Sequence, residues 1–143
     1  MATYKSSQVT KIDSVDYDML KSNEAHGRMR VVFFDFTTPA SGNADGDIYE
    51  LCEIPIGARI LRMKTANTAL GASVVAKIGI VGADTKYGSA LDLAAAGADD
   101  FLVTVAQNYG LELIARERLI MTLTGAAPAA SQTVRGHVEY VID

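Results

Sequence analysis

The side chains able to carry acid–base or nucleophilic chemistry are few in this sequence. His26 and His137 are the only histidines, and Cys52 is the only cysteine, among 143 residues. A nucleophile–histidine–acid arrangement would have to use one of these two histidines. No G-x-S-x-G nucleophile elbow accompanies them, and we expect both to be ordinary surface histidines. The sequence therefore predicts no catalytic residue, and we expect that the protein is not an enzyme.

A metal site is the next chemistry to consider. Asn43, Asp45 and Asp47 are spaced like part of a calcium loop, but Ser41 occupies the first ligand position and Cys52 the twelfth. Turn formation explains the same residues. Metal sites of the cupin type need several inward-facing histidines, which two distant histidines cannot supply. A single cysteine also allows no disulfide within the chain, so we expect neither a metal nor another cofactor.

One glycine-rich stretch deserves comparison with phosphate-binding loops. Residues 79–88 contain Lys86, yet they match neither G-x-x-x-x-G-K-[ST] nor G-x-G-x-x-G. We interpret the stretch as a hairpin loop. Gly79 itself falls in the middle of a strand pattern, which suggests a bulge or the close approach of another backbone.

The charge of the chain argues against nucleic acid as a partner. The net charge is −4 and the isoelectric point is near 5.1, whereas nucleic-acid binding normally requires a basic face. The close pairs Arg28/Arg30 and Arg116/Arg118 could form a small basic spot, and a solvated strand face is the other interpretation. No run of about 18 apolar residues is present, so no membrane span is expected. Residues 1–20 lack the apolar core of a signal peptide, which favours synthesis in a cytoplasm.

The elements that would position these side chains are predicted to be strands and turns. The central feature is a corner in residues 46–62, where Pro55 cannot donate to a sheet and Gly57 can adopt the positive φ of a turn. Strands are expected on both sides of it, over residues 48–53 and 58–65. Residues 28–37 form the strongest strand pattern, and because they are apolar on both faces we expect that strand to lie centrally in a sheet.

Further strands are predicted from composition and alternation. They cover residues 73–81, 111–115, 117–124 and 133–142. In 117–124, Leu119, Met121 and Leu123 are expected to point inward. In 133–142, apolar residues alternate with Thr133, Arg135, His137 and Glu139, which predicts one dry face and one wet face.

The segment 91–107 shows mixed signals. Ala94–Ala96 favours a helix, Gly97 breaks it, and residues 101–105 have strand composition. We expect a short helical or irregular excursion followed by a strand. About eight strands separated by turns predict an all-β antiparallel β-sandwich, an eight-stranded jelly roll, with an immunoglobulin-like sandwich as the alternative.

The first part of the chain differs from the rest. Residues 1–27 are polar and lack a regular period, which predicts an extended N-terminal arm ahead of a single β-sandwich domain over residues 28–143. The arm still contains apolar side chains that it cannot bury against itself, and these are predicted to bind a partner: Val9, Ile12, Val15, Tyr17 and Leu20. A first strand packed on its own domain is the other interpretation.

Five stretches of residues 28–143 have a shared texture of strands and corners: VVFFDFT, YELCEIPIGARIL, VVAKIGIVGAD, LIMTLTGAAPAA and GHVEYV. Together they resemble the capsid decoration or cement proteins of tailed bacteriophages. The resemblance implies a jelly roll that binds the outside of an assembled capsid and reinforces it without catalysis. It also implies the major capsid protein and other copies of the chain as partners, in a homo-oligomer. The implied location is the exterior of the virion capsid, after synthesis in the host bacterial cytoplasm.

A second function class remains open. A carbohydrate- or receptor-binding β-sandwich module of a phage fibre or tail would stack its ligand on exposed aromatic side chains. The sequence has no tryptophan, and its scattered candidates are Tyr49, Tyr87, Tyr109 and Tyr140. An enzyme is a third class, which two unsupported histidines disfavour.

Overall fold

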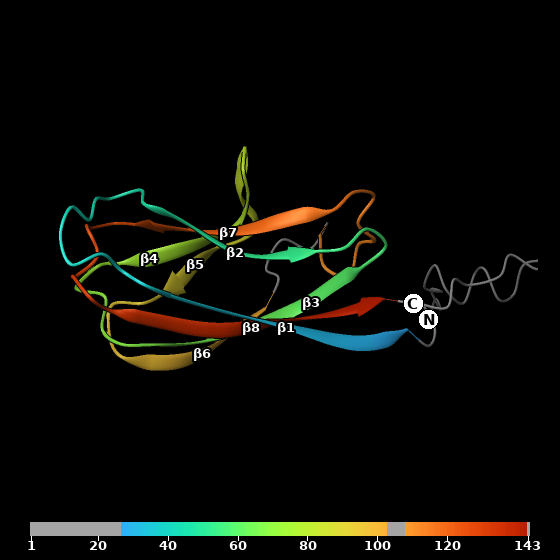
Figure 1. Cartoon of the computed structure of the whole chain (residues 1–143), viewed down its shortest axis with the longest axis horizontal. Helices are drawn as coiled ribbons and strands as arrows, with labels where there is room; N and C mark the ends of the chain where they lie inside the picture. Colours follow the sequence, from blue (N-terminus) through green and yellow to red (C-terminus); the bar gives the residue numbers. More distant parts are fainter. Residues whose placement is uncertain (1–26, 103–107, 143) are drawn as a thin grey trace, which may run out of the picture.

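The computed structural model describes residues 27–102 and 108–142, which form two layers of β-strands (Figure 1). The strands are β1 Arg28–Thr37, β2 Ile48–Ile54, β3 Arg59–Asn67, β4 Val75–Ile80, β5 Ala83–Asp92, β6 Gly97–Leu102, β7 Glu117–Thr124 and β8 Thr133–Ile142. These residues include no helix long and apolar enough to cross a membrane. The predicted bounds of β1, β7 and β8 are confirmed.

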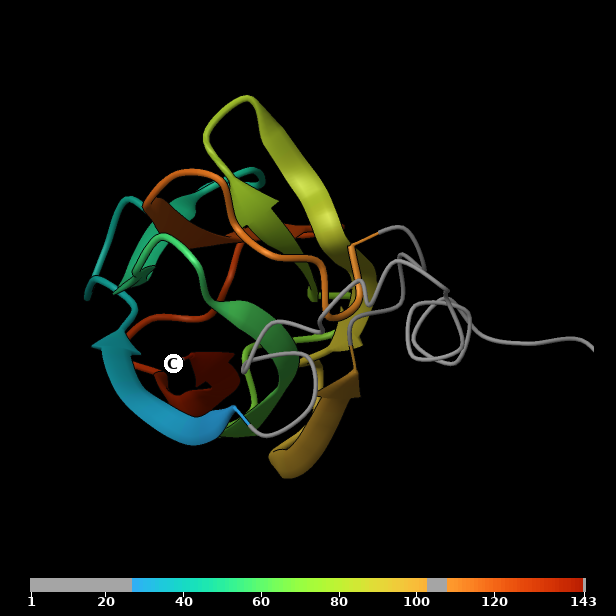
Figure 2. The ribbon, with the colours of Figure 1, turned by 90° about the vertical axis from the view of Figure 1, so that its right-hand side faces the viewer.

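The strands form two four-stranded antiparallel sheets. The first, sheet A, has the order β1-β8-β3-β6, and the second, sheet B, has the order β2-β7-β4-β5. Figure 2 views the molecule from the end where β1 begins and shows the two sheets curving around a common core. This order is that of a jelly roll. The immunoglobulin-like alternative is wrong, since its strands are divided between the sheets as ABED and CFG.

The predicted corner carries the chain from one sheet to the other. Gly57 has a φ of 83°, and the Ala58 amide donates to the Pro55 carbonyl at 3.3 Å, which closes a tight turn. Ile54 before the turn and Ile60 after it are both buried. Because β2 belongs to sheet B and β3 to sheet A, both isoleucines reach the core between the sheets.

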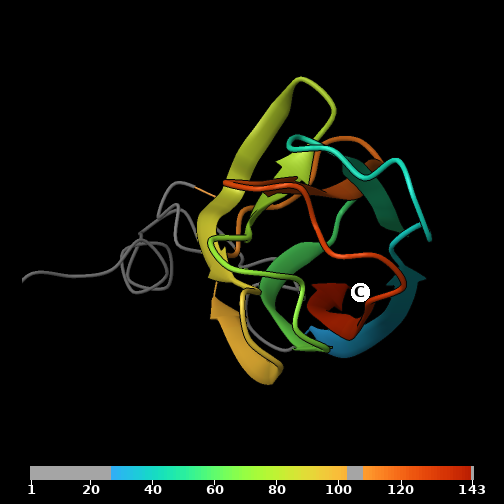
Figure 3. The ribbon, with the colours of Figure 1, turned by 90° about the vertical axis from the view of Figure 1, so that its left-hand side faces the viewer.

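The core lies between the two sheets and draws most heavily on their inner strands. Its fully buried side chains include Ile54, Leu70, Ile78, Leu93, Leu119, Met121, Leu123, Val134 and Val138. The predicted inward positions of Leu119, Met121 and Leu123 are confirmed. Figure 3 shows the opposite end of the sandwich, where the loops after β1 and before β8 are joined by a hydrogen bond from the Thr38 amide to the Gln132 carbonyl at 2.8 Å.

β1 does not lie centrally, and that prediction is wrong. It pairs with β8 on one side and is the edge strand of sheet A. Phe34 points into the core, whereas the neighbouring Phe33 is largely exposed. An edge strand with two apolar faces therefore leaves one of them uncovered by the described residues.

The hairpin loop predicted for residues 79–88 is also wrong. The turn takes up only Val81 and Gly82, and β5 begins at Ala83. The polar composition of β5 is typical of a turn, but pairing with β4 makes it a strand. The close approach predicted at Gly79 is confirmed, since a Cβ atom there would lie 2.0 Å from the Ala83 carbonyl oxygen.

Two other predicted elements are replaced by irregular chain. Residues 94–96 are bends rather than a helix, because the Asn67 side chain holds the Ala95 carbonyl at 2.8 Å. The strand expected at 101–105 begins at Gly97, and residues 103–107 lie outside the described parts. Residues 111–115 form no strand, and Glu112 makes one isolated bridge to Arg59.

Candidate interaction surface

The most distinctive surface feature is an apolar stripe on β1. Met29, Val31 and Phe33 alternate along the outward face of the strand and are 62%, 46% and 76% exposed. Residues two apart on a strand lie on the same face, so the three side chains are neighbours. Single exposed apolar residues are normal on a soluble protein, whereas a contiguous stripe indicates an interaction site.

The stripe borders a hollow on the outer face of sheet A. The strand register places Phe33, His137, Lys64 and Asp100 in one row across the sheet. The next row across the sheet ends in Ala66 and Ala98, whose short side chains project little from the outer face of the sheet. The result is a hollow of about 570 Å³.

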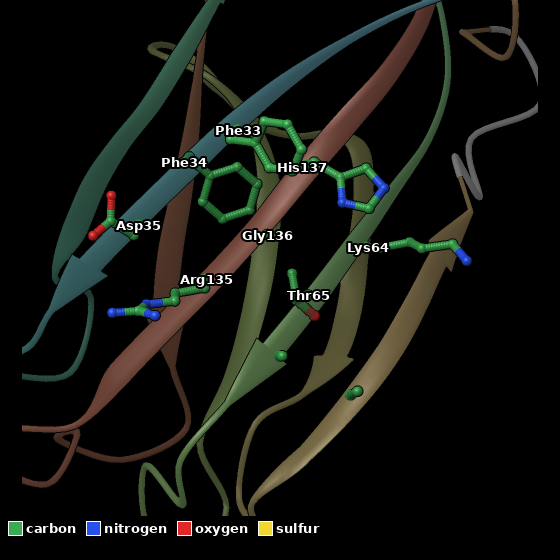
Figure 4. Close-up of a pocket in the computed structure, with 10 residues that line it drawn as sticks. Phe33, Phe34, Asp35, Lys64, Thr65, Arg135, Gly136 and His137 are labelled. Carbon is green, nitrogen blue, oxygen red and sulfur yellow. The ribbon is translucent and has the colours of Figure 1, made fainter.

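Figure 4 shows how the side chains border this hollow. The Phe33 ring and the His137 imidazole lie together, with ring centroids 5.6 Å apart. Asp35 and Arg135 lie on the other side of the hollow. They are directly opposite each other in the register of β1 and β8. Neither of these two has an ion-pair partner among residues 27–102 and 108–142, so both remain available to a ligand.

A charged network lies beside the stripe. The Arg62 Nε donates to Glu139 Oε2 at 2.6 Å, and His137 Nε2 lies 3.3 Å from Glu139 Oε1. The hydrogen bond from Arg62 lowers the pKa of the Glu139 carboxyl and raises the pKa of Arg62. Glu139 is only 8% exposed, so the prediction of a wet outer face on β8 is wrong at this residue. Glu139 is buried because the Arg62 side chain on the neighbouring strand covers its carboxylate.

The chemistry of this face suits binding rather than catalysis. It combines a large exposed aromatic ring, a methionine and arginines, which are enriched at protein interfaces. Its carboxylate Glu139 already accepts hydrogen bonds from protein groups. The face therefore offers apolar contact area with a charged rim.

A second apolar area lies at the end of the sandwich, beside the β2–β3 corner. Ile56 is exposed there, and so are Tyr109, Leu111 and Ile114 of the segment before β7. Backbone hydrogen bonds fasten this segment to the corner, as in the 2.8 Å bond from the Gly57 amide to the Leu113 carbonyl. This end patch lies at the same end of the molecule as the start of β1 (Figure 2).

The site residues predicted in the arm lie outside the described residues. This applies to Val9, Ile12, Val15, Tyr17 and Leu20, and also to His26. The partner-binding role of the arm stays a prediction.

Two of the candidate calcium residues accept backbone hydrogen bonds, one within their own loop and one from the chain after β7. Asp45 Oδ1 accepts from the Gly125 amide at 3.0 Å, and Asp47 Oδ2 accepts from the Ala44 amide at 2.9 Å. The bond to Asp47 matches the interpretation of the stretch as a turn, and the bond to Asp45 fastens that turn to the end of β7. Within the described ranges, no three His, Cys, Asp or Glu residues are grouped to hold a metal ion.

The two arginine pairs differ in their surroundings. Arg118 contacts Glu50 at 3.1 Å and Glu53, and Arg116 lies 3.4 Å from Glu53. The hydrogen bond from Arg118 lowers the pKa of Glu53, so this pair forms no basic spot. Arg28 and Arg30, at the start of β1, have no ion-pair partner in the described part of the chain.

The tyrosines fit a sugar-stacking role poorly. Tyr87 is 2% exposed, and its hydroxyl donates to Glu117 at 2.5 Å, with burial raising the pKa of Tyr87. Tyr49 stacks on Phe36 with ring centroids 4.1 Å apart. Tyr109 is the exposed member of the set. Phe33, which sequence reasoning missed as a surface residue, is the better aromatic platform.

Comparison with known proteins places this geometry in context. No family model matches the chain, and no curated protein matches it in sequence. Among solved structures, a chain of the cyanophage Pam1 capsid asymmetric unit is 20% identical with a TM-score of 0.67, and the match covers 82% of this chain and 86% of that one. The chain shares its fold with proteins of phage capsid structures.

Two further phage capsid structures also contain chains with a similar fold. A chain of the capsid of Ralstonia phage GP4 is 20% identical, with a TM-score of 0.63 and the same coverage of 82% and 86%. A chain of the acidic stable capsid of Helicobacter pylori bacteriophage KHP30 is 13% identical, with a TM-score of 0.50, over 80% of this chain and 94% of that one. The resemblance to phage head proteins is thus confirmed at the level of the fold, over nearly the full length of the matched chains.

Proposed function

We propose that this chain is a structural virion protein that binds the outer surface of an assembled phage capsid and stabilises it, as a decoration or cement protein. The observation that carries the proposal is the jelly-roll match to chains of two phage capsid structures, which covers 86% of each. The apolar stripe on sheet A supplies a surface suited to attachment. The role requires no catalysis, cofactor, nucleic acid or membrane.

The partners in this role are the major capsid protein and other copies of the chain in a homo-oligomer. A copy that touches several subunits gains from each contact, because each one holds the others in place. Binding to the assembled shell but not to free subunits shifts the assembly equilibrium towards the shell by mass action. The protein is then synthesised in the host bacterial cytoplasm and located on the capsid exterior.

The arm is proposed to add to this attachment. Residues 1–27 form the arm and residues 28–143 the domain. Burying each of Val9, Ile12, Val15, Tyr17 and Leu20 against a neighbouring subunit would contribute about 1.5–3 kcal/mol, less the entropy cost of ordering the arm. A surplus of a few kcal/mol per copy suffices to determine occupancy.

Cryo-electron microscopy of particles made with and without the chain tests the proposal. We expect density for a jelly roll on the outside of the shell and lower resistance of the particle to heat without it. Phe33→Ser should lower occupancy about 10-fold, since central apolar anchors carry much of the binding energy. Val81→Ser is the matched control, because Val81 is equally exposed at 76% but lies at the tip of the β4–β5 hairpin.

Other results would contradict specific parts of the proposal. A chain located in the tail, or absent from the particle, would refute the decoration role. Normal occupancy of the Phe33→Ser particles would refute the stripe as the attachment site while leaving the role intact.

The carbohydrate-binding alternative retains one favourable observation, the hollow beside the exposed Phe33 ring. A glycan array with the full chain tests it. Saturable binding to one sugar class that Phe33→Ala abolishes, and Tyr109→Ala at an exposed tyrosine away from the hollow does not, would establish this function. The absence of binding would exclude the sugars on the array.

A further inference from the structure

The outer edge of β1 is unusually accessible for pairing with another strand. All ten of its residues pair with β8 in one unbroken register, and its other edge pairs with no strand among the residues that the structure describes. Proteins normally protect such edges with bulges, charges or short strands, because free N–H and C=O groups invite another chain to pair.

The other three edge strands carry such protection. β2 has a register shift between Glu50 and Cys52, and β5 has two shifts against β4. β6 is six residues long and contains Asp99 and Asp100. β1 is ten residues long, has no register shift and carries its charges towards its two ends, and it adds the apolar stripe. Its free edge is therefore the surface of the sandwich best prepared to accept a strand.

We propose that the free edge of β1 pairs antiparallel with β1 of a second copy, about a two-fold axis at Val31. This pairing joins two copies of sheet A into one eight-stranded sheet. The inference rests on the homo-oligomer of the proposed function and names the surface that forms it.

The register follows from the side chains. A two-fold axis at Val31 places Val31 opposite its own copy and Met29 opposite Phe33, so the apolar stripe meets itself. An axis at Arg30 would oppose two arginines, and an axis at Val32 would oppose Met29 to Asp35. Apolar pairs directly across a sheet stabilise it, whereas like charges there are destabilising. The axis at Val31 is thus the favoured choice among these neighbouring registers.

The charges along β1 disfavour the parallel direction. Arg28 and Arg30 lie at the start of β1, and Asp35 lies near its end. None of the three has an ion-pair partner in the described ranges. Asp35 lies on the outer face of the sheet and the two arginines on the alternate face, so the antiparallel register places no like charges opposite each other, whereas in-register parallel pairing would oppose each charge to its own copy.

Cross-linking of the full chain tests the two-fold axis. Val31→Cys in a Cys52→Ser background should form a disulfide-linked dimer under mild oxidation, because paired residues on antiparallel strands lie within about 5.5 Å between Cα atoms. Ile114→Cys is the matched control, since Ile114 is more exposed, at 93%, but lies off β1. It should form little disulfide-linked dimer under the same oxidation.

Sedimentation equilibrium gives a second readout. Val31→Arg places two like charges opposite each other and should raise the dimer dissociation constant at least about 30-fold, whereas Ile114→Arg should not change it. A full chain that stays monomeric at about 100 μM would overturn the inference, because specific interfaces of standard size bind far more tightly than that. So would equal cross-linking of both cysteine variants, or a monomer whose β1 amides are all protected from hydrogen exchange.

The particle experiment separates this inference from the proposed function. Dimers that never attach to particles would refute the decoration role alone. An unaltered chain that decorates particles to full occupancy but stays monomeric in sedimentation would refute the β1 pairing alone.

Discussion

Substitution of Gly136 is the most direct test of how sheet A is packed. It lies in the inner strand β8, opposite Phe34 of β1 and Thr65 of β3. A Cβ atom at this position would lie 2.2 Å from the Lys64 carbonyl oxygen and 2.6 Å from Cζ of Phe34. Ordinary contacts of a Cβ atom begin near 3.4 Å. Gly136→Ala therefore requires both β3 and the Phe34 ring to move by about 1 Å.

The magnitude follows from which atoms must move. Overpacking a well-packed site costs about 1–3 kcal/mol, and the upper end applies because one of the obstructing atoms is backbone held between two strands. A loss of about 3 kcal/mol corresponds to a drop of roughly 10 °C in Tm for a chain of this length. The hollow beside Phe33 should change shape as well, since Phe34 and Gly136 both line it.

Urea unfolding followed by circular dichroism measures the effect. Gly97→Ala is the matched control, because a Cβ atom there meets nothing within 4 Å, and its free energy of unfolding should stay within about 0.5 kcal/mol of the unaltered protein. A loss below about 1 kcal/mol for Gly136→Ala, or one equal to that of the control, would refute the packing described for β1, β8 and β3.

Three other predictions concern the arm and two titratable groups. Deleting residues 1–20 should leave a domain that unfolds cooperatively but binds particles at least about 10-fold more weakly; aggregation of the truncated chain would instead assign those residues to the core. The Glu139 carboxyl has a lowered pKa because Arg62 donates to it, so its stabilisation is present above the ordinary value of 4.5 and is lost as the pH falls through the lowered pKa. Glu139→Gln should then destabilise the protein at pH 7 and flatten its acid sensitivity, and unchanged urea midpoints would contradict this. Burial raises the pKa of the Cys52 thiol to about 11, so alkylation by iodoacetamide at pH 8 should be roughly 100-fold slower than in urea, and equal rates would contradict the burial.

The sequence alone determined the local elements of this protein. The bounds of β1, β7 and β8 and the corner at Pro55 and Gly57 follow from alternation, β-branched composition and turn chemistry, which involve only near neighbours in the chain. The scarcity of histidine and cysteine likewise limited the chemistry before any fold was known. The strands and turns together sufficed to predict a jelly roll.

The tertiary structure decided which faces and edges remain open. A strand that is apolar on both faces has the same composition whether two neighbours cover it or a partner does, so the sequence could not place β1 at an edge. β5 looked like a loop until pairing with β4 made it a strand. Glu139 is covered by Arg62, which lies 77 residues away in the chain. The stripe, the hollow and the free edge of β1 arise from such long-range pairings, and no local pattern encodes them because each depends on how distant strands meet.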